Sequence, residues 1–125
     1  MSLTAAGLPA IASAPPREFD GPGDRWSPED LLCASVADCF ILTFRAVARA
    51  SKLSWLQLNC RVEGTLERVD GITKFTRFVT YAELKVPPGT DVERSKLLLD
   101  KAEHGCLIAN SLTATRSLEA QVISP

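Results

Sequence analysis

The stretch SPEDLLCASVADCFILTFRAVARAS, residues 27–51, predicts the element around which the rest of the chain is organised. Ser27 is placed to cap the first turn of a helix, Pro28 suits its first position, and Asp30 complements the positive end of its dipole. The pattern predicts a helix to about Ser51, on the order of 35 Å long. Because few of its residues are polar, most of its circumference must be covered by other elements or by another subunit.

A β-hairpin is predicted after this helix. Apolar and polar residues alternate over 56–67 and again over 77–86, which is typical of half-buried strands. Asp70-Gly71 between them is a common hairpin turn, and Pro87-Pro88-Gly89 ends the second strand.

The remaining segments complete an α+β arrangement with one sheet packed on helices. Gly105 is expected at the C′ position of the second helix, and Cys106 near the start of a short third one. The expected elements are a strand over 8–14, a loop over 15–26, a helix over 91–104, a short helix over 107–112 and a strand over 115–122.

Composition limits the classes of protein to consider. The 125 residues, 46% of them hydrophobic, fit a single domain over 1–125 with a sizeable core. A net charge of -1 argues against nucleic-acid or anionic-membrane partners. Asp38, Arg45 and Arg49 are expected to interrupt the long helix as a membrane span. The N-terminus lacks the basic segment of a secretory signal, so a cytoplasmic location is expected.

Four cysteines are the candidate chemical groups. They include no CxxC pair, and His104 alone does not complete a zinc-ligand pattern, so no metal site is expected. Cys33 and Cys60 are interpreted as small core residues. Cys106 has two interpretations: a packing residue at a helix junction, or a thiol whose ionisation is favoured by helix-start amides and by His104.

A combination of four segments is specific, although each segment alone is weak. The segments are Pro16-Arg17-Glu18-Phe19-Asp20-Gly21-Pro22-Gly23, Trp26-Ser27-Pro28-Glu29-Asp30-Leu31-Leu32, Ala37-Asp38-Cys39-Phe40, and Ala102-Glu103-His104-Gly105-Cys106 followed by Asn110-Ser111-Leu112. From Leu8 onward the chain thus resembles the OsmC/Ohr family, the osmotically inducible proteins C and organic hydroperoxide resistance proteins.

The resemblance implies a fold in which an antiparallel sheet packs against a long central helix, within an interlocked homodimer. It also implies a thiol peroxidase without a cofactor. Cys39 looks like the thiolate that attacks the O–O bond of an organic hydroperoxide, and the resulting sulfenic acid would condense with Cys106 to a disulfide. An external dithiol, often of lipoyl type in the family, would then restore the two thiols.

Glu29 looks like the acidic residue that supports such a site in the family. It lies ten residues before Cys39 on the same predicted helix, roughly 15 Å away, beyond the reach of a carboxylate. We therefore expect Glu29 to serve the site of a partner chain, or else to be an N2 residue favoured only by the helix dipole.

Some residues depart from the family pattern. The hydroperoxide-reducing members carry an arginine on an N-terminal hairpin that is expected to be absent here. Arg25 and Arg17 could take the place of that arginine as the charge that stabilises the thiolate, or they are solvated loop charges. Leu107 stands where many members have proline after the second cysteine. Asp38 stands where many have a small residue, and helix geometry is expected to turn it away from the Cys39 sulfur.

The sequence leaves three hypotheses for function. The leading one is the homodimeric peroxidase, with Leu32, Val36, Phe40 and Leu42 lining an apolar pocket for the alkyl chain of the hydroperoxide. The second is an OsmC-like dimer without peroxidase activity that binds a small ligand at its cleft. The third is an α+β interaction module in which the cysteines are incidental.

Overall fold

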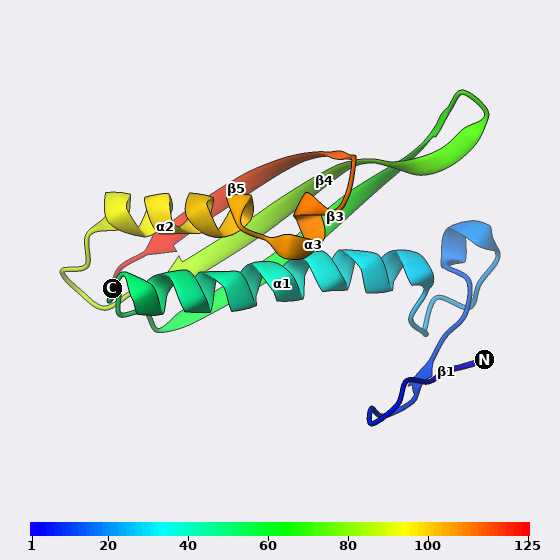
Figure 1. Cartoon of the computed structure of the whole chain (residues 1–125), viewed down its shortest axis with the longest axis horizontal. Helices are drawn as coiled ribbons and strands as arrows, with labels where there is room; N and C mark the ends of the chain where they lie inside the picture. The colour runs from blue at the N-terminus through cyan, green and yellow to red at the C-terminus, as the bar shows by residue number, and fades with distance from the viewer.

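The computed structural model describes all residues, 1–125, and is built on one long helix that runs beneath a twisted sheet (Figure 1). In chain order the elements are β1 (Ser2–Leu3), β2 (Ile11–Ala12), the 3₁₀ turn η1 (Arg17–Phe19), α1 (Pro28–Ala50), β3 (Gln57–Val69), β4 (Ile72–Lys85), α2 (Val92–His104), α3 (Leu107–Asn110) and β5 (Thr115–Ile123).

Helix α1 begins and ends as the sequence predicts. The Ser27 hydroxyl accepts a hydrogen bond from the Asp30 amide at 3.0 Å, and Pro28 is the first helical residue. The helix then continues for 23 residues. One narrow stripe, at every fourth residue, is fully covered: Val36, Phe40, Phe44 and Ala48. This stripe fixes which side of α1 faces the sheet.

The hairpin between β3 and β4 is also confirmed. Both turn residues have positive φ, 51° at Asp70 and 79° at Gly71, which is the requirement of a two-residue turn that matches the twist of the strands. The strands extend further toward this turn than the alternation of residues predicts. Hydrophobic side chains near the tip, such as Leu66 and Ile72, remain exposed, so side-chain burial does not mark these strand ends.

The expectation of an antiparallel sheet is wrong for the last strand. The sheet order is β3-β4-β5, and β5 runs parallel to β4, from the pair Arg77 and Thr115 to the pair Lys85 and Ile123. Helices α2 and α3 lie between these strands in the chain and return it to the starting end of β4, as a parallel pair requires. The sheet is therefore mixed.

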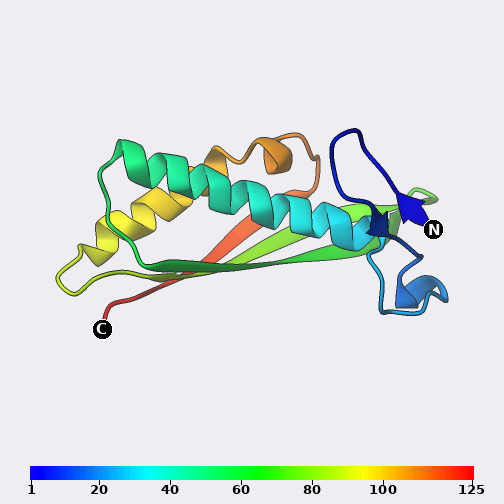
Figure 2. The same cartoon turned by 90° about the horizontal axis from the view of Figure 1, so that it is seen from below.

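All three helices cover the same face of this sheet (Figure 2). The core between the layers is apolar and contains the fully buried Phe40, Phe44, Leu84, Val86 and Leu99. Burial of each of these large side chains contributes about 1.5–3 kcal/mol. Two layers held by this core and by a smaller buried cluster of Val36, Cys106 and Ala109 give the α+β architecture that the sequence predicts.

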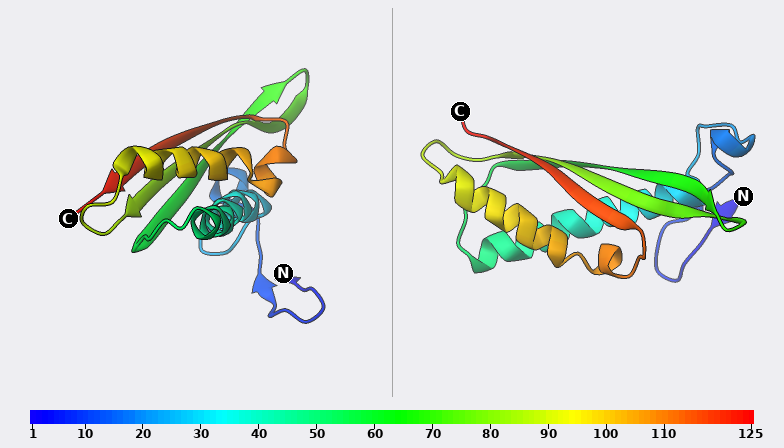
Figure 3. Two further views of the ribbon diagram at one scale, coloured as in Figure 1. Left: turned by 60° about the vertical axis from the view of Figure 1, so that its left-hand side comes forward. Right: turned by 90° about the horizontal axis from the view of Figure 1, so that it is seen from above.

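The N-terminal segment differs from its prediction. Strand β2 occupies only two residues of the expected strand over 8–14, and it pairs with β1, which the sequence analysis did not predict. This short hairpin projects away from the body of the molecule (Figure 3). Its apolar residues are mostly exposed, because the sheet of the body offers them no neighbouring strand.

Asp38, Arg45 and Arg49 were expected to interrupt α1 as a membrane span. By length and composition alone, however, this helix is apolar enough to cross a membrane. The buried stripe nevertheless packs in the core against the sheet. Within this chain, 22% of its most apolar segment is buried, which leaves a large apolar helix face without a covering element.

Candidate active site

Cys39 lies in the middle of α1 and is half-buried. It opens into a surface groove of about 530 Å³ beside the helix. The other residues that line this groove are Ser35, Asp38, Leu42, Thr43, Ala46 and Ile108. A sulfur at the floor of a partly apolar groove is accessible to a small organic molecule.

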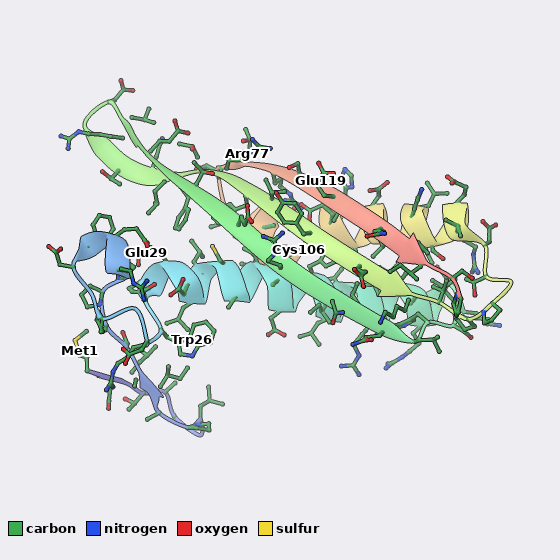
Figure 4. The ribbon with its side chains drawn as sticks, turned by 180° about the vertical axis from the view of Figure 1, so that it is seen from behind. Met1, Trp26, Glu29, Arg77, Cys106 and Glu119 are labelled. Carbon is green, nitrogen blue, oxygen red and sulfur yellow. The ribbon has the colours of Figure 1, made fainter.

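Cys106 is the residue immediately before α3 and is fully buried. It packs with Val36 and Ala109, and Cys39 packs against the same cluster. Both thiols are free, and each acts on the pKa of the other; the Cys106 thiol also donates to the Val36 carbonyl at 3.9 Å. In Figure 4, Cys106 lies near the middle of the molecule, where the sheet passes over the helices. The fold thus brings together two cysteines that are far apart in the chain.

The environment lowers the pKa of Cys39. Burial raises this pKa, but hydrogen bonds outweigh it: the Ile108 and Leu107 amides and the Cys106 thiol all act on the Cys39 sulfur. These donors come from α3 and the residue before it. A sulfur surrounded by such donors is stabilised as a thiolate, which is the nucleophilic form of cysteine.

Thr43 also lies next to Cys39, with 3.9 Å between its hydroxyl oxygen and the sulfur. The single hydroxyl proton is donated to the Cys39 backbone carbonyl at 2.7 Å. We therefore attribute the lowered pKa of Cys39 chiefly to the amides and to the Cys106 thiol, although the hydroxyl acts in the same direction.

The pKa of Cys106 is raised, contrary to the interpretation that helix-start amides activate it. Burial raises it most, the Ala109 amide lowers it, and the hydrogen bond to Cys39 and the charges of Cys39 and Glu103 raise it further. The Cys106 side chain forms no cap hydrogen bond at the start of α3. His104 does not assist, because its ring is exposed and its Nδ1 lies 2.8 Å from the Asp100 carbonyl. Cys106 is therefore held as a neutral thiol.

Of the residues expected to line an apolar pocket, only Leu42 lines the groove at Cys39; it is 51% exposed. Val36 and Phe40 belong to the buried stripe of α1 that faces the sheet, and Leu32 lies outside the groove. Helical position separates them, because the residues that share the face of Cys39 follow it at three, four and seven positions: Leu42, Thr43 and Ala46.

The expected charged residues do not meet Cys39 within one chain. Arg25 lines an open hollow beside Trp26, and Arg17 packs against the backbone of Gly23. Neither contributes to the pKa of Cys39. Glu29 lies at the N-terminal end of α1, well away from Cys106 (Figure 4), and its Oε2 is buried without a hydrogen-bond partner. That unpartnered carboxylate oxygen needs a donor from elsewhere.

Asp38 and Leu107, the two residues beside the cysteines that differ from the family pattern, have different consequences. Asp38 lines the groove, but it does not contribute to the pKa of Cys39, as expected from its turn away from the sulfur. Leu107 retains a backbone amide, which acts on Cys39. Proline at that position has no amide hydrogen, so this chain has a donor that a Cys-Pro pair lacks.

The other cysteines are partly buried and protonated. Burial raises the pKa of Cys33, which lies against Gly64 on β3. Burial raises the pKa of Cys60 to about 11, helped by the charges of Glu103 and Cys106. No group of three or more His, Cys, Asp or Glu side chains is placed to hold a metal ion. Cys39 is thus the single thiol whose pKa its surroundings lower.

Sequence reasoning missed an ion pair next to this site. The Arg116 Nε donates to the Glu103 Oε1 at 2.8 Å, and Glu103 is 7% exposed. Arg116 also donates to the Asn110 side chain at 2.6 Å. One sequence signal was available: Arg116 occupies the inward phase of the last predicted strand, an uncommon place for an arginine without a partner.

Comparison with known proteins gives a consistent family. A family model described as OsmC-like protein matches residues 21–120. An uncharacterised protein of Bacillus subtilis, YmaD, is 26% identical over 85% of this chain. An organic hydroperoxide resistance protein of Xanthomonas axonopodis pv. citri is 34% identical over 77% of it. The matches cover 73% and 66% of these two relatives, so the chain spans about two thirds to three quarters of their length.

Solved structures agree at the level of the fold. An OsmC-like protein of unknown function from Vibrio cholerae superposes with a TM-score of 0.84 at 18% identity, over 98% of this chain and 82% of its own. An organic hydroperoxide resistance protein OsmC from Legionella pneumophila superposes with a TM-score of 0.75 at 26% identity, over 93% and 82%.

Proposed function

Because the chain belongs to the OsmC family, we propose that it is a thiol-dependent peroxidase that reduces organic hydroperoxides to alcohols. The observation that carries the proposal is the contact between two free thiols whose pKa values move in opposite directions, Cys39 down and Cys106 up. One sulfur is ready to attack, and its neighbour keeps a proton until the first has reacted.

In the first step the Cys39 thiolate attacks the terminal oxygen of the hydroperoxide. The S–O bond forms as the O–O bond breaks, the alkoxide takes up a proton and leaves as an alcohol, and Cys39 becomes a sulfenic acid. The sulfur gives up two electrons and the peroxide accepts them. The groove at Leu42 and Ala46 offers apolar surface for the organic part of the substrate.

In the second step the Cys106 sulfur attacks the sulfenic sulfur of Cys39. The S–S bond forms, the S–O bond breaks, and the Cys106 proton leaves with the hydroxyl group as water. Only a short movement is required, since Cys39 already packs against the cluster that contains Cys106. An external dithiol then reduces the disulfide and is itself oxidised. Cys106 is fully buried, so this dithiol approaches through the groove at Cys39.

We propose that the functional unit is a homodimer. The large uncovered apolar face of α1, including Leu42, is suited to a second copy of the chain. The buried, unpartnered Oε2 of Glu29 is satisfied on this proposal by a donor at the partner's site, with Arg25 or Arg17 as candidate thiolate-stabilising cations. Four free cysteines favour a reducing compartment, the cytoplasm.

Single-cysteine variants test the reaction. Cys39→Ser should abolish consumption of cumene hydroperoxide in the presence of a dithiol, whereas Cys106→Ser should react once and stop at the sulfenic acid, which dimedone traps. Cys33→Ser is the matched control on the same helix and should retain turnover. If the folded wild-type chain consumes no organic hydroperoxide with dihydrolipoamide or dithiothreitol, the proposal is wrong and the ligand-binding alternative is favoured.

A further inference from the structure

The guanidinium of Arg116, the second residue of β5, joins two helices. Its Nε donates to the Glu103 side chain at 2.8 Å, and its Nη2 donates to the Glu103 carbonyl. Its Nη1 donates to the Asn110 Oδ1 at 2.6 Å, and the Asn110 amide group donates to the His104 carbonyl at 3.0 Å. One side chain thereby fixes the end of α2 and the end of α3 together.

The segment enclosed by these contacts carries the site. Glu103 precedes Cys106 and Asn110 follows it, so Arg116 holds both sides of the segment 104–109. That segment contains the three donors that act on the Cys39 sulfur from outside α1. Hydrogen bonds weaken steeply with distance and angle, so the ionisation of Cys39 depends on how firmly this segment is held.

The arrangement is more specific than a surface ion pair. The side chains of Arg116 and Glu103 are 26% and 10% exposed, so solvent screens them little. The planar guanidinium supplies three donors in fixed directions, whereas a lysine ammonium could not reach all three acceptors at once. The register of β5 decides the placement: Arg116 pairs with the buried Phe78, on the helix-facing side of the sheet.

We propose that Arg116 is a positioning residue of the peroxidase: by joining Glu103 to Asn110 it holds Cys106 and the first turn of α3 against Cys39. This rests on the proposed function for its catalytic consequence, but not for its effect on the Cys39 thiolate. Arg116 touches neither sulfur. It acts through the segment that carries Cys106, so that the resolving thiol meets the sulfenic acid as soon as it forms.

The first test is the pH profile of Cys39 alkylation by iodoacetamide, read by mass spectrometry on the full-length chain. Arg116→Met should move the profile to higher pH and slow alkylation at pH 7 about threefold to tenfold, because hydrogen bonds to the thiolate are lost or lengthened. Arg116→Lys should fall between Met and wild type. Arg77→Met is the matched control, since Arg77 is exposed on the neighbouring strand without a hydrogen bond or ion pair (Figure 4), and should leave the profile unchanged.

The second test follows one equivalent of cumene hydroperoxide in the presence of dimedone. Wild type should form the Cys39–Cys106 disulfide, whereas Arg116→Met should accumulate several-fold more dimedone adduct at Cys39. The alkylation profile needs no peroxide, so failure of wild type to react with hydroperoxide overturns the proposed function and leaves the positioning role to be decided by the first test.

A merely structural role would lower the melting temperature of Arg116→Met without moving the alkylation profile, and that result would overturn the inference. If Arg116→Met does not fold, Arg116→Lys and Asn110→Ala decide instead. Asn110→Ala removes the hydrogen bonds to Arg116 and to the His104 carbonyl and leaves the ion pair between Arg116 and Glu103 intact. Both variants should shift the pH profile of Cys39 alkylation to higher pH, as is expected for Arg116→Met. Unchanged profiles in both variants would contradict the proposal.

Discussion

Cys39 and Cys106 share one contact, yet their surroundings favour opposite protonation states. Cys39, in the middle of a long helix, has a lowered pKa, and Cys106, at the start of a short helix, has a raised one. General expectation assigns these roles the other way round, because the start of a helix stabilises a thiolate. The amides of Leu107 and Ile108 act instead on the neighbouring sulfur of Cys39. What matters is which sulfur the amides reach.

The largest expected difference between thiols is in alkylation of the native wild-type chain. At pH 7 iodoacetamide should label Cys39 at least about a hundredfold faster than Cys60, because the pKa of Cys60 is about 11 and that of Cys39 lies below its usual range. Cys106 should stay unlabelled, since it is fully buried. Peptide mass spectrometry after a short pulse measures this, and labelling of Cys106 before Cys39 would contradict the comparison.

The Cys106 thiol should itself support the ionisation of Cys39. Cys106→Ala removes this donor, which raises the pKa of Cys39, shifts its alkylation profile to higher pH and slows its labelling at pH 7 about threefold to tenfold. Cys106→Ser retains a hydroxyl donor and should cause a smaller shift. Equal profiles for the alanine and serine variants would show that the contact between the sulfurs does not set the pKa.

A smaller effect is expected from the Leu107 amide. Leu107→Pro removes one donor to Cys39 and should slow its alkylation at pH 7 about twofold to threefold. Proline suits the first position of a helix, so α3 should be retained. Leu107→Ala keeps the amide and is the control for loss of the exposed side chain. Identical rates in the two variants would mean that this amide does not stabilise the thiolate.

The smallest effect is expected for Asp38→Asn. Asp38 lines the groove but does not act on the Cys39 pKa, so neutralising it should leave the alkylation profile unchanged within about twofold. Faster labelling of Cys39 at neutral pH in this variant, at low ionic strength, would show that the carboxylate does oppose its ionisation.

Local patterns predicted the regular elements well and failed where distant parts of the chain decide the outcome. The Ser27 cap and the Asp70-Gly71 turn are set by neighbouring residues and are confirmed. The direction of β5 was predicted wrongly, because alternating residues mark a strand but not its orientation. Gly105 was expected at the C′ position of α2, where the left-handed conformation is common, but it is the C-cap residue with a φ of -91°. An added Cβ at Gly105 would lie 3.3 Å from the Lys101 carbonyl oxygen, and this tight approach favours glycine there instead.

The sequence by itself determined that Cys39 lies within a long apolar helix and that Cys106 lies at a helix junction, because capping and periodicity act over a few residues. Only the tertiary structure decided that these sulfurs meet, which of them the α3 amides serve, and that Arg116 joins Glu103 to Asn110 beside them. These outcomes depend on packing between segments distant in the chain, and on hydrogen-bond geometry within ångströms, which no local pattern encodes.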